Sequence, residues 1–146
     1  MQAIFTRYLI LEIDWRVKIG SAPVKTSRRV SWNDCDPSGR IRFQAVFDWF
    51  VDAEVEFLRE LGIVEAFGTM PRVAAEAEYA LGLWYDDAVE LEVSVIEIGR
   101  SSVRYRFVVR SGGEEAASGT VKCVYVVDGR SAALPDPIRT ALEGAK

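Results

Sequence analysis

The spacing of the hydrophobic residues changes once along this chain, and that change leaves few folds open. Over residues 44–62 the apolar side chains recur every three to four positions, as in an amphipathic helix of about five turns. After residue 70 apolar and polar residues alternate, which is typical of half-buried strands. Four stretches show this alternation: 71–80, 88–99, 101–110 and 115–127. One long helix followed by four strands predicts an α+β fold, an antiparallel sheet packed against a single helix.

The chain also begins with an alternating segment. Residues 7–20 have apolar side chains at every second position, and the sequence GSAP at 20–23 then breaks the pattern. We therefore expect an N-terminal extension over residues 1–23, either an added strand or a loosely docked segment, and one domain over residues 24–146. The apolar runs are too short for a transmembrane helix, which needs ~20 residues.

Helix boundaries are marked by capping residues. Gly62 stands where the C-cap of the long helix is expected. Near the end of the chain, Asp136 and Pro137 predict a short helix over residues 136–144, with Asp136 as its N-cap and Pro137 as its first residue.

A charged turn precedes the long helix. In the sequence DCDPSG, Asp34 and Asp36 are two residues apart, and Pro37 and Gly39 follow them. Asp, Pro and Gly are the residues that tight turns prefer, so the motif predicts a turn whatever else it does. Its two carboxylates, next to a helix N-terminus, also make it the strongest candidate for chemistry.

The composition excludes several kinds of site. The chain has no histidine, so it has no Ser-His-Asp or Cys-His arrangement and no zinc site with histidine ligands. Its two cysteines, Cys35 and Cys123, have no metal-binding spacing, and they suit a reducing cytoplasm. The net charge of −4 argues against nucleic acid as a partner. Any catalysis must use carboxylates, a tyrosine, a thiol or backbone amides.

The order of these elements, with DCDPSG before the long helix, resembles the hotdog-fold acyl-CoA thioesterases of the 4-hydroxybenzoyl-CoA thioesterase type. The most specific part is the D-x-D-P-x-G motif followed by the helical sequence FDWF at residues 47–50. Looser matches are Pro71, the sequence EAE at 76–78, IGRSS at 98–102 and LPDPIRTALE at 134–143. The resemblance implies a hotdog fold, in which the sheet wraps around the long helix.

The resemblance also implies a reaction centre. The second aspartate of the motif is the catalytic carboxylate in that family, and the matching residue here is Asp36. The thioester carbonyl is expected to lie against a backbone amide, which by position is the N–H of Phe43. This chain departs from the commoner family pattern in having Arg42, Phe43 and Gln44 where relatives have an apolar residue, tyrosine or histidine, and proline.

Further residues are expected to bind the substrate. Trp49 and Trp84 are available, with Phe43, to line a narrow pocket for an apolar or aromatic acyl group. Arg100 and Ser101 match a turn where relatives hold the phosphates of coenzyme A. Arginines alternate along the next strand and predict either an extension of a basic patch or the solvated face of the sheet: Arg104, Arg106 and Arg110.

Other residues compete for the catalytic role. Asp34 is expected to cap the turn locally. A different branch of hotdog thioesterases takes its carboxylate from the middle of the helix, but Asp52, Glu54 and Glu56 fit a solvated helix face better. Cys35 is a weak nucleophile candidate because no histidine can activate it.

Together these features predict a thioester hydrolase of the cytoplasm that acts on acyl-CoA and needs no metal and no further cofactor. Two alternatives remain: a thioesterase for acyl groups on a carrier protein, and an acyl-binding protein without catalysis. Sheet edges left open in one copy predict a homodimer or homotetramer. Nucleic acid and membranes are not expected as partners.

Overall fold

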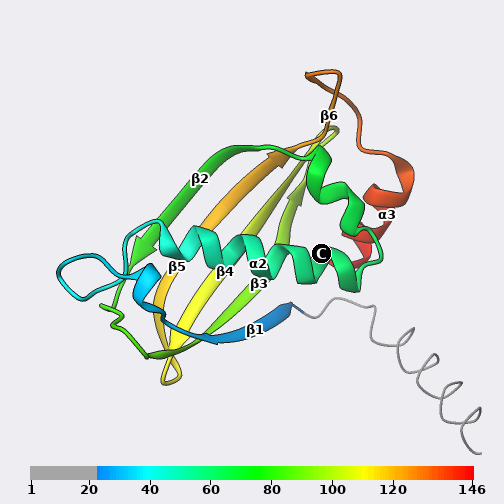
Figure 1. Ribbon diagram of the computed structural model, residues 1–146. Coiled ribbons are helices and arrows are strands. Elements are labelled where there is room, and N and C mark those ends of the chain that lie inside the picture. Colours follow the sequence, from blue (N-terminus) through cyan, green and yellow to red (C-terminus); the bar gives the residue numbers. More distant parts are fainter. Residues whose placement is uncertain (1–22) are drawn as a thin grey trace, which may run out of the picture.

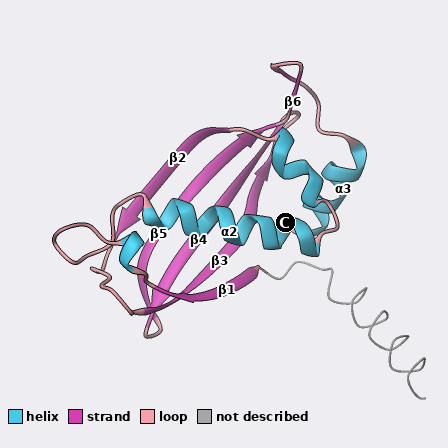
Figure 2. Ribbon diagram, in the orientation of Figure 1, coloured by secondary structure: helices cyan, strands magenta, loops and turns pink. Residues whose placement is uncertain are grey.

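The computed structural model describes residues 23–146, and these form the predicted α+β hotdog arrangement (Figure 1). One antiparallel sheet holds five strands: β1 Val24–Arg29, β2 Arg72–Tyr79, β3 Ala88–Ile98, β4 Ser102–Ser111 and β5 Glu114–Val124. Their order across the sheet is β1-β3-β4-β5-β2, so β1 and β2 are its edges. Helix α2, Ala45–Glu60, lies across one face of the sheet (Figure 2). The predicted N-terminal extension lies outside the described residues.

The core lies between α2 and the inner face of the sheet. Alternate residues of each strand turn toward the helix, as the period-two pattern predicts. The ring of Phe50 on α2 packs 5.8 Å from Tyr105 and 5.7 Å from Phe107, centre to centre, and both belong to β4. All three side chains are fully buried. Their burial fixes α2 over the middle of the sheet.

The long helix ends as its sequence predicts. Gly62 has φ +72°, and its N–H donates to the carbonyl of Arg59 at 3.0 Å. The N–H of Ile63 donates to the carbonyl of Leu58 at 2.9 Å. This pair of bonds is a Schellman motif, which needs a residue that tolerates positive φ. The helix itself is shorter than predicted, with 16 residues.

The last predicted strand, 115–127, is interrupted. Tyr125 leaves the sheet because its N–H donates to the carbonyl of Ser101 at 2.7 Å. The residues after it, Val126–Val127 (β6), pair with Arg130–Ser131 (β7) in a small separate hairpin.

The short helices differ in detail from the predictions. Helix α3, Asp136–Gly144, starts one position early, because Pro135 occupies the N-cap position and Asp136 is already helical. Two 3-10 helices, η1 Trp32–Asp34 and η2 Val64–Thr69, were not predicted. None of the helices within the described residues is long and apolar enough to cross a membrane.

A bulge at the start of β2 reverses the faces of its first residues. Arg72 lies opposite Cys123 and Ala74 opposite Lys122, so Val73 is left without a partner. Because a bulge inserts one residue, Arg72 shares the inner face with Cys123, and Val73 is 57% exposed. Strict alternation would have placed Val73 inside and the arginine outside.

Candidate active site

The charged turn closes on itself around Asp36. The N–H of Asp36 donates to the carbonyl of Arg40 at 2.9 Å, and the N–H of Gly39 donates to the carbonyl of Asp36 at 2.9 Å. Gly39 has φ +85°, a backbone conformation that glycine adopts without strain. The turn predicted from Pro37 and Gly39 is therefore present.

The Asp36 carboxylate is exposed and partly engaged by the turn. Its Oδ1 atom accepts hydrogen bonds from the N–H of Ser38 at 2.8 Å and from the Ser38 hydroxyl at 2.5 Å. These bonds, helped by the charge of Arg40, hold the pKa of Asp36 below its ordinary value. The carboxylate is therefore ionised at neutral pH. Its Oδ2 atom has no hydrogen-bond partner within residues 23–146.

An open amide lies seven residues further on, at the start of α2. The carbonyl of Arg42 accepts from the N–H of Ala45 at 3.0 Å, so it points along the helix. Because the C=O and N–H of a trans peptide point in opposite directions, the N–H of Phe43 points away from the helix. It has no acceptor among the described residues. Such amides at a helix N-terminus attract negative charge, so this N–H can bind a developing oxyanion.

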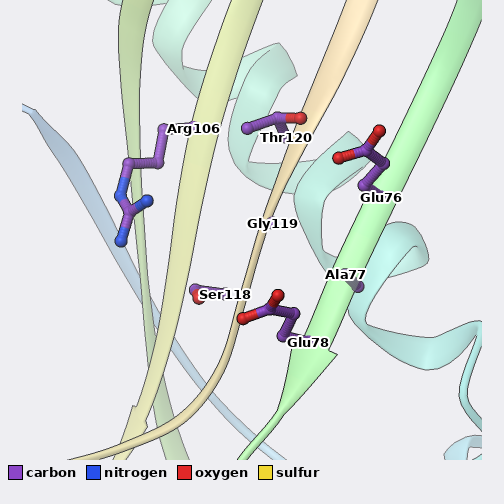
Figure 3. A pocket seen from close by; sticks show the side chains of 7 residues that line it. All are labelled: Glu76, Ala77, Glu78, Arg106, Ser118, Gly119 and Thr120. Carbon is purple, nitrogen blue, oxygen red and sulfur yellow. The ribbon is translucent and has the colours of Figure 1, made fainter.

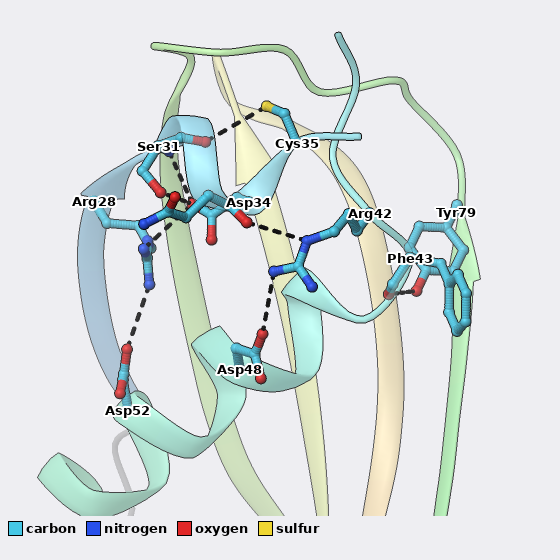
Figure 4. Close-up of polar contacts among 10 residues, drawn as sticks. Arg28, Ser31, Asp34, Cys35, Arg42, Phe43, Asp48, Asp52 and Tyr79 are labelled. Atoms are coloured by element: carbon cyan, nitrogen blue, oxygen red, sulfur yellow. Dashed lines mark hydrogen bonds and ion pairs between the residues drawn. The ribbon is translucent and has the colours of Figure 1, made fainter. Parts of the chain in front are cut away.

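A buried carboxylate holds the loop and the helix start together (Figure 4). Asp34 is 6% exposed and accepts from the N–H and hydroxyl of Ser31 at 2.8 and 2.9 Å. It also pairs with Arg28 of β1 at 3.4 Å. Its own backbone carbonyl accepts from the N–H of Arg42 at 2.7 Å. Burial raises the pKa of Asp34, but the bonds from Ser31 and the charge of Arg28 outweigh burial and lower it overall.

The two tryptophans predicted for the pocket have different surroundings. Trp84 is 46% exposed and lies against the charged turn, with the Arg40 guanidinium 5.1 Å from its ring centre. A Cβ atom on Gly39 would come within 3.3 Å of the same ring. Trp49 is 1% exposed, so within one chain its ring belongs to the core and not to the surface beside Asp36.

Residues 30–142 match the family model described as the thioesterase-like superfamily. The chain belongs to this superfamily. The match spans the charged turn, α2 and the whole sheet from β3 to β5, so the predicted hotdog-fold thioester hydrolase is confirmed at the level of the family.

Known proteins similar to this thioesterase agree with that assignment. A 1,4-dihydroxy-2-naphthoyl-CoA hydrolase of Prochlorococcus marinus is 28% identical over 112 residues, 68% of this chain and 72% of that protein. A Thermus thermophilus thioesterase solved with coenzyme A and zinc is 26% identical, with a TM-score of 0.76 over 82% of this chain and 91% of that one. A solved gentisyl-coenzyme A thioesterase is 25% identical, with a TM-score of 0.75 over 81% of this chain and 98% of that one.

In one copy of the thioesterase, Arg100 and Ser101 lie far from Asp36. Their turn joins β3 to β4 beside α3, where Arg139 donates to the carbonyl of Arg100 at 3.0 Å. The charged turn follows β1, whose last residue, Arg29, pairs with the opposite end of β3. The 11 residues of β3 therefore separate the two places by roughly 30 Å. A single chain does not bring these predicted site residues together.

Glu54 is not on the solvated face of the helix, and that prediction is wrong. It is 1% exposed and forms an ion pair with Arg72, and the Cys123 thiol lies 3.8 Å from its Oε1 atom. Burial raises the pKa of Glu54 to about 7, although the charge of Arg72 opposes that rise. Its spacing of four from both Phe50 and Leu58, which are buried, was the sequence signal for this position.

The other competing groups remain structural. Asp52 is exposed and pairs with Arg28 at 3.4 Å, while Glu56 pairs with Arg59 on the helix surface. Cys35 is half-buried, and its thiol lies 3.5 Å from the carbonyl of Ser31. Within the part of the chain that the structure describes, no cluster of three metal-ligating side chains occurs. The expectation that no metal is needed stays a prediction.

The outer face of the sheet carries mixed charge. An open hollow of about 200 Å³ lies there, with Arg106 facing Glu76 and Glu78 across β5 (Figure 3). Arg104 pairs with Glu97 at 3.3 Å, and Arg110 pairs with Glu92 at 3.4 Å. The three alternating arginines therefore belong to the solvated sheet face, the second of the two predicted readings.

Proposed function

We propose that this thioesterase hydrolyses acyl-CoA, with Asp36 as the catalytic carboxylate and the N–H of Phe43 as the donor to the thioester oxygen. One observation carries the proposal. An ionised carboxylate with a free oxygen and an outward, unpaired amide lie on the same connection, directly before α2.

The chemistry follows from these two groups. Asp36 acts either as a base that takes a proton from water or as a nucleophile that attacks the carbonyl carbon itself. In the first route the water oxygen bonds to the carbonyl carbon, the carbon–sulfur bond breaks, and the proton passes from Asp36 to the leaving thiolate. In the second, water then hydrolyses the anhydride formed on Asp36. In both, the N–H of Phe43 stabilises the negative oxygen.

The surface beside Asp36 favours an aromatic acyl group. Phe43 is 69% exposed and Trp84 is 46% exposed, so flat apolar surface is available next to the carboxylate. The similar proteins named for a substrate act on 1,4-dihydroxy-2-naphthoyl-CoA and gentisyl-CoA, both with aromatic acyl groups. We propose no cofactor besides the coenzyme A of the substrate, and a cytoplasmic setting.

A second copy of the chain completes the proposed site. β2 is an edge strand with no neighbour on its open side among residues 23–146. Pairing of this edge with a second copy is a way to bring Arg100 and Ser101 of one chain toward Asp36 of the other. Arg100 is exposed and free to reach coenzyme A phosphates.

A panel of aryl and alkyl acyl-CoA thioesters, followed by release of free thiol, tests the proposal. We expect aryl-CoA hydrolysis that falls about 100-fold or more in Asp36→Asn, because asparagine keeps the turn but cannot act as base or nucleophile. Asp52→Asn, which removes an exposed carboxylate from α2, is the matched control and retains the rate. Equal rates in the parent and Asp36→Asn would contradict the role of Asp36.

The same panel distinguishes the alternatives. A carrier-protein thioesterase would hydrolyse an acyl group on a carrier protein faster than the same group on coenzyme A. An acyl-binding protein without catalysis would bind the thioesters and leave them at the background rate.

A further inference from the structure

A tyrosine of the edge strand reaches the helix start. Tyr79 is the last residue of β2, and its hydroxyl donates to the backbone carbonyl of Phe43 (Figure 4). The register places Tyr79 opposite Ala117, which is buried on the inner face of the sheet. The tyrosine ring therefore spans from the edge strand to the residue that carries the open amide.

The carbonyl of Phe43 depends on this hydroxyl because α2 gives it no donor. The N–H groups of Phe47 and Asp48 both donate to the carbonyl of Gln44, at 2.9 and 3.3 Å. The hydroxyl of Tyr79 is thus the donor to this carbonyl within the described residues. A helix end whose groups lack intrahelical partners is ordinarily held by such side chains.

The two peptide planes beside Phe43 are held from opposite sides. The plane before it is fixed by the bond from Ala45 to the Arg42 carbonyl, at 3.0 Å. The plane after it is fixed by Tyr79. Because each peptide is planar, fixing both carbonyls fixes the backbone angles of Phe43 and the direction of its N–H. Loss of the Tyr79 bond leaves the second plane free to turn.

We propose that Tyr79 is a positioning residue that holds the Phe43 amide in the orientation needed to bind the thioester oxygen. This inference rests on the proposed function. Partial burial raises the pKa of Tyr79, so the hydroxyl keeps its proton and stays a donor at neutral pH. Since oxyanion donors act through their geometry, a small rotation at Phe43 lowers turnover more than substrate binding.

The test is Tyr79→Phe, which removes only the hydroxyl. We expect kcat to fall by about tenfold while KM stays within about twofold, since loss of one positioning hydrogen bond acts on the transition state. The control is Tyr85→Phe, because both tyrosines are 45% exposed and Tyr85 stacks on Trp32 through its ring. Tyr85→Phe keeps the parent kcat.

A second measurement does not depend on catalysis. In amide NMR spectra, Tyr79→Phe shifts or broadens the Phe43 and Gln44 signals, and Tyr85→Phe leaves them in place. If the parent hydrolyses acyl-CoA but Tyr79→Phe keeps its kcat, the inference is overturned. If the parent hydrolyses none, the proposed function fails, and the amide signals then decide: unchanged signals overturn the role of Tyr79, and displaced signals support it.

Discussion

Glu54 of helix α2 and Arg72 of the edge strand form an ion pair beneath the helix, with the Glu54 side chain 2% and the Arg72 side chain 29% exposed. The bulge that turns Arg72 inward makes this pair possible. The pair joins the middle of the long helix to the start of β2.

Removing one partner of this pair should destabilise the fold. Arg72→Met leaves Glu54 buried without its cation, and we expect a loss of about 3 kcal/mol in the free energy of unfolding. The double variant Glu54→Leu with Arg72→Met removes both charges and should lie within about 1 kcal/mol of the parent. Urea unfolding measures both, and equal losses in the two variants would contradict the importance of the pair.

Stability should also fall as pH rises. The folded-state pKa of Glu54, about 7, lies above the ordinary value of 4.5, so the folded state binds the extra proton between these values. Its contribution is fully present below about pH 4.5 and is lost as pH rises through 7. The groups facing Glu54 are Arg72, Cys123 and Tyr105, and none of them titrates in this window, because burial raises the pKa of Cys123 to about 12 and that of Tyr105 further above its ordinary value.

The measurement compares the free energy of unfolding at about pH 5 and about pH 8, where we expect a fall of about 2 kcal/mol. The absence of histidine leaves no imidazole to obscure the change. Glu54→Gln should show little of this fall. A parent protein whose stability is constant over the window would contradict the prediction.

Activity should depend on pH quite differently. The pKa of Asp36 is lowered, chiefly by the Ser38 hydroxyl, so the carboxylate remains ionised down to acidic pH. We expect kcat/KM to be constant between about pH 5 and pH 8 and to fall only below about pH 4. Ser38→Ala removes one of these bonds and should move the acidic limb toward higher pH. An acidic limb that stays in place in Ser38→Ala would assign it to another group.

The Asp36 turn should tolerate no side chain at Gly39. Gly39→Ala introduces a Cβ at φ +85° and within 3.3 Å of Trp84, so we expect a stability loss of about 1 kcal/mol together with reduced kcat. Gly113→Ala is the matched control, because its φ is +81° and it has open space around it in the β4–β5 hairpin. It should lose similar stability and keep kcat. Equal kcat in the two variants would separate the turn from catalysis.

Light scattering at micromolar concentration tests assembly. If a second copy completes the site, the mass should be at least twice the 16.3 kDa of one chain. A value equal to one chain at concentrations where the protein is fully active would contradict the need for a partner.

The fold was largely predictable because its signals are local. The apolar spacing from Val46 to Leu61 sets a helix, Gly62 ends it, and Asp36 to Gly39 can hardly form anything but a turn. The bulge at Val73 was not predictable, because alternation continues on either side of it and only the register with β5 shows the slip. The burial of Glu54 depends on that slip, since its partner faces inward only because of it.

The candidate site was predictable only in part. Asp36 and Phe43 are close in sequence, so one connection places both. The contact from Tyr79 to Phe43 spans 36 residues and follows from packing, which composition and period do not specify. The separation of Arg100 from Asp36 follows from the strand order, because β3 runs the length of the sheet between them.

The bulge at Val73 also limits how a neighbouring chain can add to the sheet. A regular edge strand is a template along which further strands can join without a natural stop. Here the regular edge runs only from Ala74 to Tyr79, since the bulge twists the strand before it. Two chains can therefore pair over a short, fixed length, and the geometry that admits one partner discourages growth into an aggregate of stacked strands.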